Sequence, residues 1–317
     1  MGRYAARRLL QLIPVFFGAT FLLFAMVYVI PGDPVRALFG ERQVSEATLN
    51  EIRERYNLND PFLVQYGKYM GVVPDGEEGF SGLFQGDLGE DFRGRAVTDI
   101  IGQRFPTTVR LAVGAILVQS VIGVLAGILA AIRRNSFMDN LVLVSTTFLV
   151  AVPLFVSASV AQLVFGLRLG WFPIAGLRDG AISYALPIIM LASISLAYVA
   201  RLTRTSMVEN GRADYVRTAR AKGLPVPRVV GRHVLRNSLI PVITFIGVDF
   251  GQLLGGAIIT ETIFNIPGIG RAVFEAVNQR EGAVVVGIVT LLVVVYLLAN
   301  LIVDLLYGVL DPRIRYE

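Results

Sequence analysis

Long apolar stretches alternate with polar segments along the whole chain. The apolar stretches cover residues 9–30, 107–132, 141–167, 184–200, 239–259 and 284–307. A helix of about 20 residues crosses the roughly 30 Å hydrocarbon core of a bilayer, and each stretch is long enough to do so with some tilt. The pattern therefore predicts an all-α integral membrane protein with six transmembrane helices.

The first apolar stretch follows Arg3, Arg7 and Arg8, an arrangement that resembles the start of a signal peptide. The stretch is longer than an ordinary signal-peptide core, however, and no small-residue cleavage site follows it. Residues 31–34, Pro-Gly-Asp-Pro, predict a turn at its end. We therefore expect a transmembrane helix that is retained in the protein.

Basic residues between the apolar stretches predict how the chain is oriented. The segment 201–236 contains nine Arg and Lys residues against Glu209 and Asp214, and Arg133 and Arg134 follow the second stretch. Basic residues accumulate in short cytoplasmic loops. With six spans, this distribution predicts a multi-pass protein of the plasma (inner) membrane whose N- and C-termini both lie in the cytoplasm.

The segment between the first two spans is then extracytoplasmic. Within it, Ser45 is placed to cap one amphipathic helix, and Asp60-Pro61 is placed to begin another. We predict two regions in the chain. Residues 1–103 hold the first transmembrane helix and the extracytoplasmic segment, and residues 104–317 hold the other five spans and a cytoplasmic loop, 201–237.

A short polar segment interrupts the apolar pattern inside this loop. Asp214 can cap the start of a helix, Gly223 offers a left-handed stop, and Pro225 opposes continuation. Tyr215 and Ala219 stand four residues apart and share one face. We predict a short helix, held between two spans, that can press against a soluble partner.

The composition agrees with a membrane protein. Of the 317 residues, 54% are hydrophobic and 17% are charged, which is more apolar surface than one soluble core buries. The net charge of +5 would suit a nucleic-acid partner, but the basic residues follow the membrane topology, so we expect no nucleic acid. The chain has no cysteine, which excludes disulfides, thiolate metal sites and cysteine nucleophiles.

Catalytic and nucleotide-binding patterns are missing from the sequence. The Gly67-Lys68 pair lacks the upstream glycine and the following Ser or Thr of a P-loop. The single histidine, His233, has no carboxylate or cysteine pattern around it, so a structural or interfacial role is favoured over a metal or hydrolase site. We therefore predict no catalytic residue and no metal site in this chain.

Asp249 and Gln252 are the polar residues of greatest interest inside the predicted spans. Both lie in the stretch 239–259, where a polar group is costly unless it faces a partner helix or a wet cavity. Two interpretations stay open: the residues line a translocation path, or they hydrogen-bond a neighbouring helix. The mid-span position of Asp249 favours the path, whereas Gly251 and Gly255 beside it favour close helix packing.

Motifs spread over nearly the full length give the chain a family resemblance. They include Pro31-Gly32-Asp33-Pro34, Gly86-Asp87-Leu88-Gly89, Trp171-Phe172-Pro173, Ala200-Arg201-Leu202-Thr203-Arg204-Thr205-Ser206-Met207, Arg232-His233-Val234-Leu235-Arg236-Asn237, Thr260-Glu261-Thr262-Ile263-Phe264, Pro267-Gly268-Ile269-Gly270 and Asp311-Pro312-Arg313-Ile314-Arg315-Tyr316. Each motif alone is weak, but in this order they are specific. The chain resembles the first of the two permease subunits of dipeptide and oligopeptide importers of the ATP-binding cassette (ABC) class.

The resemblance implies a type I importer permease fold, in which this chain forms half of a translocation pore with a second, homologous permease subunit. It further implies two cytoplasmic ATP-binding subunits, an extracytoplasmic substrate-binding protein and membrane lipid as partners. This chain itself would hold no cofactor, because ATP and magnesium would be bound by the partner ATPases. ATP hydrolysis would belong to those partners, and this subunit would be non-catalytic.

The resemblance also assigns ATPase coupling to the short polar helix. The coupling residues that it implies are Asp214, Tyr215, Val216, Arg217, Thr218, Ala219, Arg220, Ala221, Lys222 and Gly223. The ATPase groove would take the small and apolar side chains among them, with Ala219 nearest the ATPase. The general importer motif contains Glu-Ala-Ala, and Arg217-Thr218-Ala219 stands in its place here, a departure typical of the peptide subclass.

The substrate and the transporter class leave alternatives open. Nickel, glutathione and opine permeases share most of these motifs, so each is an alternative to a peptide. A self-contained secondary transporter would show two related halves with broken helices, and the sequence shows no half-to-half symmetry. A membrane-embedded enzyme would need a nucleophile and a base, and the single histidine argues against it.

Overall fold

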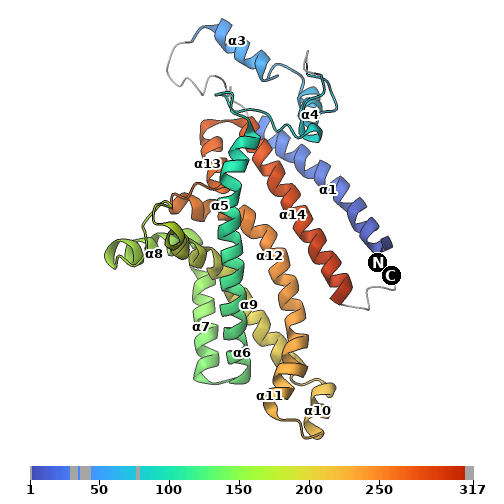
Figure 1. Ribbon diagram of the computed structural model, residues 1–317, viewed down its shortest axis with the longest axis vertical. Coiled ribbons are helices and arrows are strands. Elements are labelled where there is room, and N and C mark those ends of the chain that lie inside the picture. Colours follow the sequence, from blue (N-terminus) through green and yellow to red (C-terminus); the bar gives the residue numbers. More distant parts are fainter. Residues whose placement is uncertain (1, 29–34, 36–43, 76–78, 311–317) are drawn as a thin grey trace. The chain divides into compact units, whose positions relative to one another are not determined.

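The computed structural model describes residues 2–28, 35, 44–75 and 79–310, which are helical nearly throughout. The long helices are α1 (Gly2–Tyr28), α5 (Val97–Val118), α9 (Ala185–Asn210), α12 (Arg236–Ile263) and α14 (Gly282–Leu310) (Figure 1). The shorter helices are α3 (Glu46–Arg55), α4 (Phe62–Met70), α6 (Val124–Ile132), α7 (Phe137–Ala151), α8 (Leu154–Ala161), α10 (Asp214–Ala221), α11 (Val226–Arg228) and α13 (Ile269–Gln279). The 3-10 turns are η2 (Leu83–Gln85) and η5 (Gly180–Tyr184), and the π-helical segments are η3 (Gln119–Gly123), η4 (Gln162–Arg168) and η6 (Val229–Leu235).

Five helical segments in the described part of the chain are long and apolar enough to cross a membrane. They cover Ala6–Tyr28, Val97–Ile132, Gly180–Asn210, Val226–Leu253 and Gly282–Leu305. The bent pair Phe137–Ala151 and Leu154–Arg168 adds a sixth crossing if the pair is one span. The prediction of an all-α membrane protein is confirmed.

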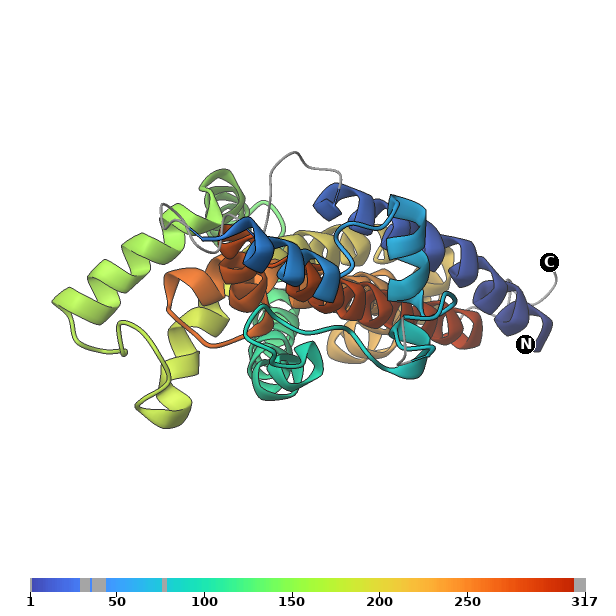
Figure 2. The same ribbon diagram turned by 90° about the horizontal axis from the view of Figure 1, so that it is seen from above.

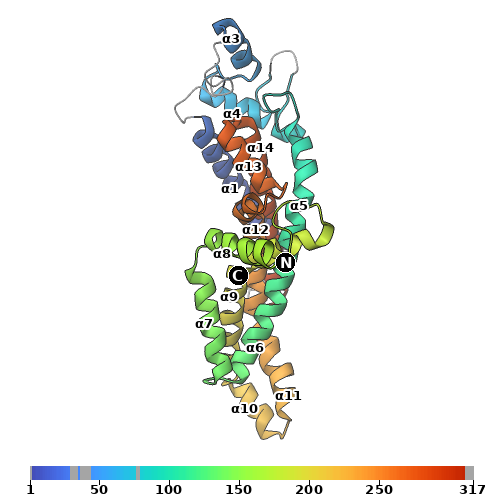
Figure 3. The same cartoon turned by 90° about the vertical axis from the view of Figure 1, so that its left-hand side faces the viewer.

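The predicted span over 141–167 is not one continuous helix. α7 and α8 meet at a break and are bent by 102° relative to each other (Figure 3). The cause is Pro153, which has no amide N–H and disfavours the helical conformation in the residue before it. Val152 accordingly has a ψ of 125°, in the extended region. The prediction is corrected to two helices joined at a proline.

The chain divides into two compact units that are each discontinuous in sequence. One contains Thr108–Ile266 and the described residues from Leu298 onward, and the other contains Arg3–Thr107 and Pro267–Leu297. Because these boundaries fall inside α5 and α14, each of these helices begins in one unit and ends in the other. The units therefore differ from the two regions predicted from the sequence.

In the unit that contains Thr108–Ile266, α9 packs against α6, α7 and α12 (Figures 1 and 3). α6 and α9 approach each other closely at glycine residues of α6 and η3. A Cβ atom added at Gly127 would lie only 2.5 Å from the carbonyl oxygen of Ala200, so the approach requires glycine there. A carbon at Gly123, at the end of η3, would lie 3.0 Å from the carbonyl oxygen of Leu196. Small residues of this kind let membrane helices approach at backbone distance.

In the other unit, two short helices follow α1 as predicted. Ser45 caps α3, and its hydroxyl oxygen accepts a hydrogen bond from the Thr48 amide at 3.2 Å. Pro61 directly precedes α4. The two predicted helix starts in this segment are therefore confirmed.

The end of α1 lies beside the start of α14 (Figure 2). A Cβ atom added at Gly282, the first residue of α14, would lie 3.0 Å from the Val27 side chain. The two helices are therefore in close contact at this glycine. The predicted turn at 31–34 lies outside the described residues, as does the terminal motif at 311–316.

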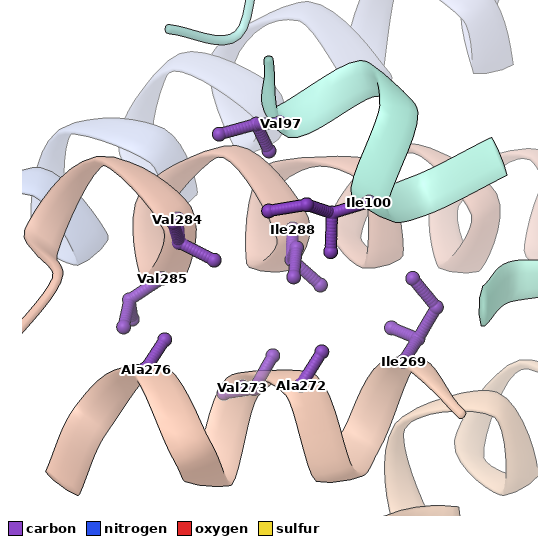
Figure 4. Packing of buried hydrophobic residues seen from close by; sticks show 9 residues of the cluster. All are labelled: Val97, Ile100, Ile269, Ala272, Val273, Ala276, Val284, Val285 and Ile288. Carbon is purple, nitrogen blue, oxygen red and sulfur yellow. The ribbon is translucent and has the colours of Figure 1, made fainter. Parts of the chain in front are cut away.

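A hydrophobic core in the same unit joins α5, α13 and α14 (Figure 4). Its residues are Val97, Ile100, Ile269, Ala272, Val273, Ala276, Val284, Val285 and Ile288. α13 was not predicted from the sequence, although its buried residues follow the i, i+3, i+4, i+7 spacing of an amphipathic helix.

One ion pair holds α13 to α5, and a second, within α13, orients the shared carboxylate. The Arg104 guanidinium donates to one carboxylate oxygen of Glu275 at 2.9 Å, and Arg271 Nε donates to the other at 2.8 Å. Partial burial opposes ionisation of Glu275, but the two guanidiniums outweigh it and hold the pKa of this carboxyl below its ordinary value.

Candidate functional site

The predicted coupling helix is present as α10, between α9 and α11 (Figure 1). Its N-cap is Ala213, which makes no side-chain cap bond, so the predicted capping role of Asp214 is wrong. Asp214 instead occupies the first turn, where its negative charge is favourable at the helix N-terminus. The Thr218 hydroxyl donates to the carbonyl oxygen of Asp214 at 3.0 Å and so bonds within the helix.

The predicted left-handed stop at Gly223 is present. Gly223 has a φ of +74°, and its amide donates to the carbonyl oxygen of Arg220 at 2.9 Å. The next amide, of Leu224, donates to the carbonyl oxygen of Ala219 at 3.3 Å. These two bonds form a Schellman motif, in which glycine adopts the positive φ at the lowest steric cost. Pro225 follows and caps α11, so the helix end is sharply defined.

The apolar side of α10 faces the protein's own interior. Val216 is fully buried and Ala219 is 5% exposed, and both pack with Met207 of α9 and with Val229 and Val234 of η6. The expectation that Val216 and Ala219 fill a groove on a partner is therefore wrong. These side chains instead fix α10 to the membrane-spanning part of the chain.

The opposite side of α10 is exposed, and three basic residues against one acidic residue give it a net positive charge. Its exposed residues are Asp214, Tyr215, Arg217, Thr218, Arg220, Ala221, Lys222 and Gly223. Arg217 lies 3.4 Å from Asp214, but both side chains are largely in solvent, where such a pair contributes little stability. This side therefore offers positive charge to an acidic macromolecular surface or to anionic lipid headgroups.

Asp249 is at the centre of a buried polar cluster between helices. It is 6% exposed, and its two carboxylate oxygens accept hydrogen bonds from Gln119 Nε2 of η3 at 2.6 Å and from the Ser195 hydroxyl of α9 at 2.9 Å. The cluster thus links three helical elements through one side chain. Gln252, predicted beside it, has an exposed side chain and does not join the cluster.

The sequence could have indicated the partners of Asp249 only in part. Gln119 is a polar residue inside an apolar stretch, which signals a buried partner. Ser195 carries no such signal, because serine is common in membrane helices and can bond its own backbone. The geometry gives Asp249 partners for packing, and its role in a translocation path stays a prediction.

Comparison with known proteins identifies the class of transporter to which this membrane architecture belongs. Residues 123–316 match the family described as binding-protein-dependent transport system inner membrane component. Residues 1–112 match the N-terminal family of the same transport systems. The chain belongs to this family of transport permeases. It is thus a transmembrane permease component, and the family description agrees with its apolar helices in assigning it to the inner membrane.

The permease is similar along its full length to curated relatives. It is 40% identical to the dipeptide transport system permease protein DppB of Alkalihalophilus pseudofirmus, with all of both chains covered. It is 39% identical to the di/tripeptide transport system permease protein DppB of Pseudomonas aeruginosa, again over all of both chains. It is also 36% identical to the glutathione transport system permease protein GsiC of Escherichia coli, at the same coverage.

The fold of the permease is shared with a solved transporter structure. The crystal structure of an amino acid ABC transporter with histidines matches with a TM-score of 0.50 and 19% identity, over 66% of this chain and 94% of that chain. At this identity the likeness concerns the fold alone. The permease thus has the type I ABC importer permease fold that its motifs imply.

Proposed function

We propose that this permease forms half of the translocation pore of a di- or oligopeptide importer and couples that pore to ATP hydrolysis through α10. A second, homologous permease subunit supplies the other half. Two cytoplasmic ATPases bind ATP and magnesium and dock against α10, and an extracytoplasmic binding protein delivers the substrate. This chain performs no chemical step itself.

The observation that carries this proposal is the two-sided character of α10. The buried side is part of the permease core, so the helix cannot move independently of α9 and η6. The exposed side is available to a partner and carries Arg217, Arg220 and Lys222. A force applied to the exposed side therefore passes into the membrane-spanning helices, as a domain closure requires.

Charge reversal tests whether the exposed side docks the ATPases. We expect the double variant Arg217→Glu and Arg220→Glu to lower ATPase retention on the purified permease by at least about tenfold, because attractive pairs at an acidic rim become repulsive. The thermal stability of the permease should not change, since both side chains are exposed. A matched control, Arg133→Glu and Arg134→Glu on the exposed turn between α6 and α7, should retain the ATPases. Equal retention by the α10 variant would rule out docking through this surface.

The full-length relatives support a peptide substrate. Two are named for dipeptides or for di- and tripeptides, at 39–40% identity. Glutathione is the second candidate, because relatives named for glutathione transport are 36–37% identical over the full length. Uptake of a labelled dipeptide with excess unlabelled glutathione separates the two candidates: a peptide importer loses little uptake, and a glutathione importer transports the dipeptide poorly from the start.

We propose an orientation in which α10 and both termini face the cytoplasm. In functional terms, residues 1–103 contribute the first span and the extracytoplasmic segment, and residues 104–317 form the permease core with its coupling loop. The basic composition of the segment around α10 supports this orientation.

Single cysteines test the orientation without background, because the chain contains none. Cysteines at Asn50 in α3 and at Arg178 before η5 are expected to react with a membrane-impermeant maleimide in intact spheroplasts. A cysteine at Arg212, between α9 and α10, should react only after lysis. All three positions are exposed in the structure. The reverse labelling pattern would require the opposite orientation.

For the translocation path, the exposed Gln252 is the stronger of the two predicted residues. Asp249 lies three residues earlier on α12, and both of its carboxylate oxygens already accept hydrogen bonds, from Gln119 and from Ser195. We propose that Gln252 lines the path, and that Asp249 holds together the helices that surround it. Gln252→Leu should lower peptide uptake without lowering permease stability, and unaltered uptake would remove Gln252 from the path.

A further inference from the structure

A partly buried ion pair joins α7 to α9 close to the start of α10. Arg204 Nε donates to one carboxylate oxygen of Asp139 at 2.5 Å, and Arg204 Nη2 donates to the other at 2.7 Å. The Asp139 side chain is 1% exposed and that of Arg204 is 19% exposed. Two parallel bonds of this kind fix the relative position and the orientation of the two side chains.

Asp139 also holds the turn between α6 and α7. The Asn135 amide donates to Asp139 Oδ2 at 2.8 Å, and Asn135 has a φ of +61°. The Ser136 hydroxyl oxygen accepts from the Asp139 amide at 3.4 Å and caps α7. One carboxylate therefore connects the α6–α7 turn to α9.

A second contact, one turn earlier on α9, reinforces the ion pair. Arg201 donates to the hydroxyl of Thr146 at 3.2 Å and to its carbonyl oxygen at 2.8 Å. At the neighbouring residues Ala200 and Thr203 of α9, the close approach of Gly127 holds α6. α6, α7 and the end of α9 thus have little freedom to slide past one another (Figure 3).

The connection from α9 to α10 is short and internally bonded. Successive amides of Gly211, Arg212 and Ala213 donate to the carbonyl oxygens of Met207, Glu209 and Asn210 at 2.9 to 3.1 Å. The Tyr215 hydroxyl reaches back to Asn210 Oδ1 at 2.8 Å. Since Val216 and Ala219 are also packed on α9, displacement of α10 displaces the end of α9 with it.

We propose that the Asp139–Arg204 pair is the positioning contact that transmits motion of α10 to the α6–α7 hairpin. The proposal rests on the coupling function proposed above and names the residues through which coupling passes inside this chain. Without the pair, the Arg201–Thr146 bonds and the packing of α6 alone would hold the hairpin to α9 less firmly, and the hairpin would follow α10 incompletely. ATP hydrolysis would then continue with less transport.

The test uses the complete importer in proteoliposomes and measures the ATP hydrolysed per peptide imported. Asp139→Asn keeps the shape of the side chain but removes its charge, and we expect the ratio to rise by at least about fivefold, the low end of typical coupling effects. Arg204→Lys keeps the charge but loses the two-point geometry, so a smaller rise is expected. Arg134→Gln, an exposed change near the same turn, should leave the ratio unchanged. A normal ratio in both Asp139→Asn and Arg204→Lys overturns the proposal.

A second measurement leaves the ion pair intact and so does not depend on how the variants fold. Spin labels on single cysteines at Asn140 in α7 and at the exposed Arg212, just before α10, report one distance without altering the docking residues. The proposal requires the same distance without nucleotide and with ATP trapped. If the complex imports peptide and this distance changes with nucleotide, the transmission proposal fails and the coupling function stands. If the complex does not hydrolyse ATP in response to substrate, the coupling function itself fails.

Discussion

Replacing Ala219 with arginine is expected to abolish coupled import while the spans remain inserted in the membrane. Ala219 is 5% exposed and packs against α9 and η6. Overfilling such a contact costs about 1–3 kcal/mol, and a buried unpaired charge costs more. α10 should therefore leave its position on the core, so that its basic side no longer moves with the spans. Hydrogen exchange of the α10 amides and ATP-driven uptake measure the two effects.

Ala221→Arg is the matched control, because it makes the same substitution on the exposed side of the same helix. It should leave hydrogen-exchange protection of α10 at the wild-type level. Wild-type protection in Ala219→Arg as well would mean that α10 is not seated through Ala219, and the account of how force enters the permease would then be wrong.

Asp249→Ala is expected to destabilise the permease strongly and to prevent assembly of the importer. The change removes two buried hydrogen bonds, each worth about 1 kcal/mol, and leaves a cavity in place of the side chain. It also leaves Gln119 buried without the acceptor for its amide. The melting temperature of the detergent-solubilised permease and recovery of the complex after purification measure this effect.

Asp249→Asn distinguishes packing from a role in the path. The Gln119 amide nitrogen now faces Asp249, but a flip of that amide would turn its side-chain oxygen, which has no hydrogen-bond partner among the described residues, toward the new Asn NH2 group. The Asn oxygen can still accept from Ser195. We therefore expect Asp249→Asn to assemble, to hydrolyse ATP and to transport. A variant that assembles and hydrolyses ATP but does not transport would show that the charge serves the path.

The third apolar stretch shows what hydrophobic periodicity leaves undetermined. Its length and composition indicate a membrane span, and Pro153 near its centre was a visible signal of a break. The same signal occurs at Pro14, Pro106 and Pro241, which lie inside continuous helices. Proline identity alone therefore does not decide between a kink and a break, because the surrounding packing determines which one forms.

The coupling helix shows a second limit. Its position and its left-handed end followed from Gly223 and Pro225, since these depend on local backbone chemistry. The sequence did not predict whether the apolar side of this helix faces the protein's own core or a partner. Val216 and Ala219 indicate only that one side of the helix is buried. Met207 and η6 bury these side chains, and their position next to α10 is set by the tertiary structure.

Reconstitution of the complete importer tests whether ATP drives import through this permease. Proteoliposomes would contain this permease with its second permease subunit and the ATPases, and would receive the binding protein with a labelled dipeptide on the side opposite α10. We expect the dipeptide to accumulate against its gradient only when ATP is supplied on the α10 side. Accumulation without ATP, driven by an ion gradient, would contradict this expectation and would favour a secondary transporter.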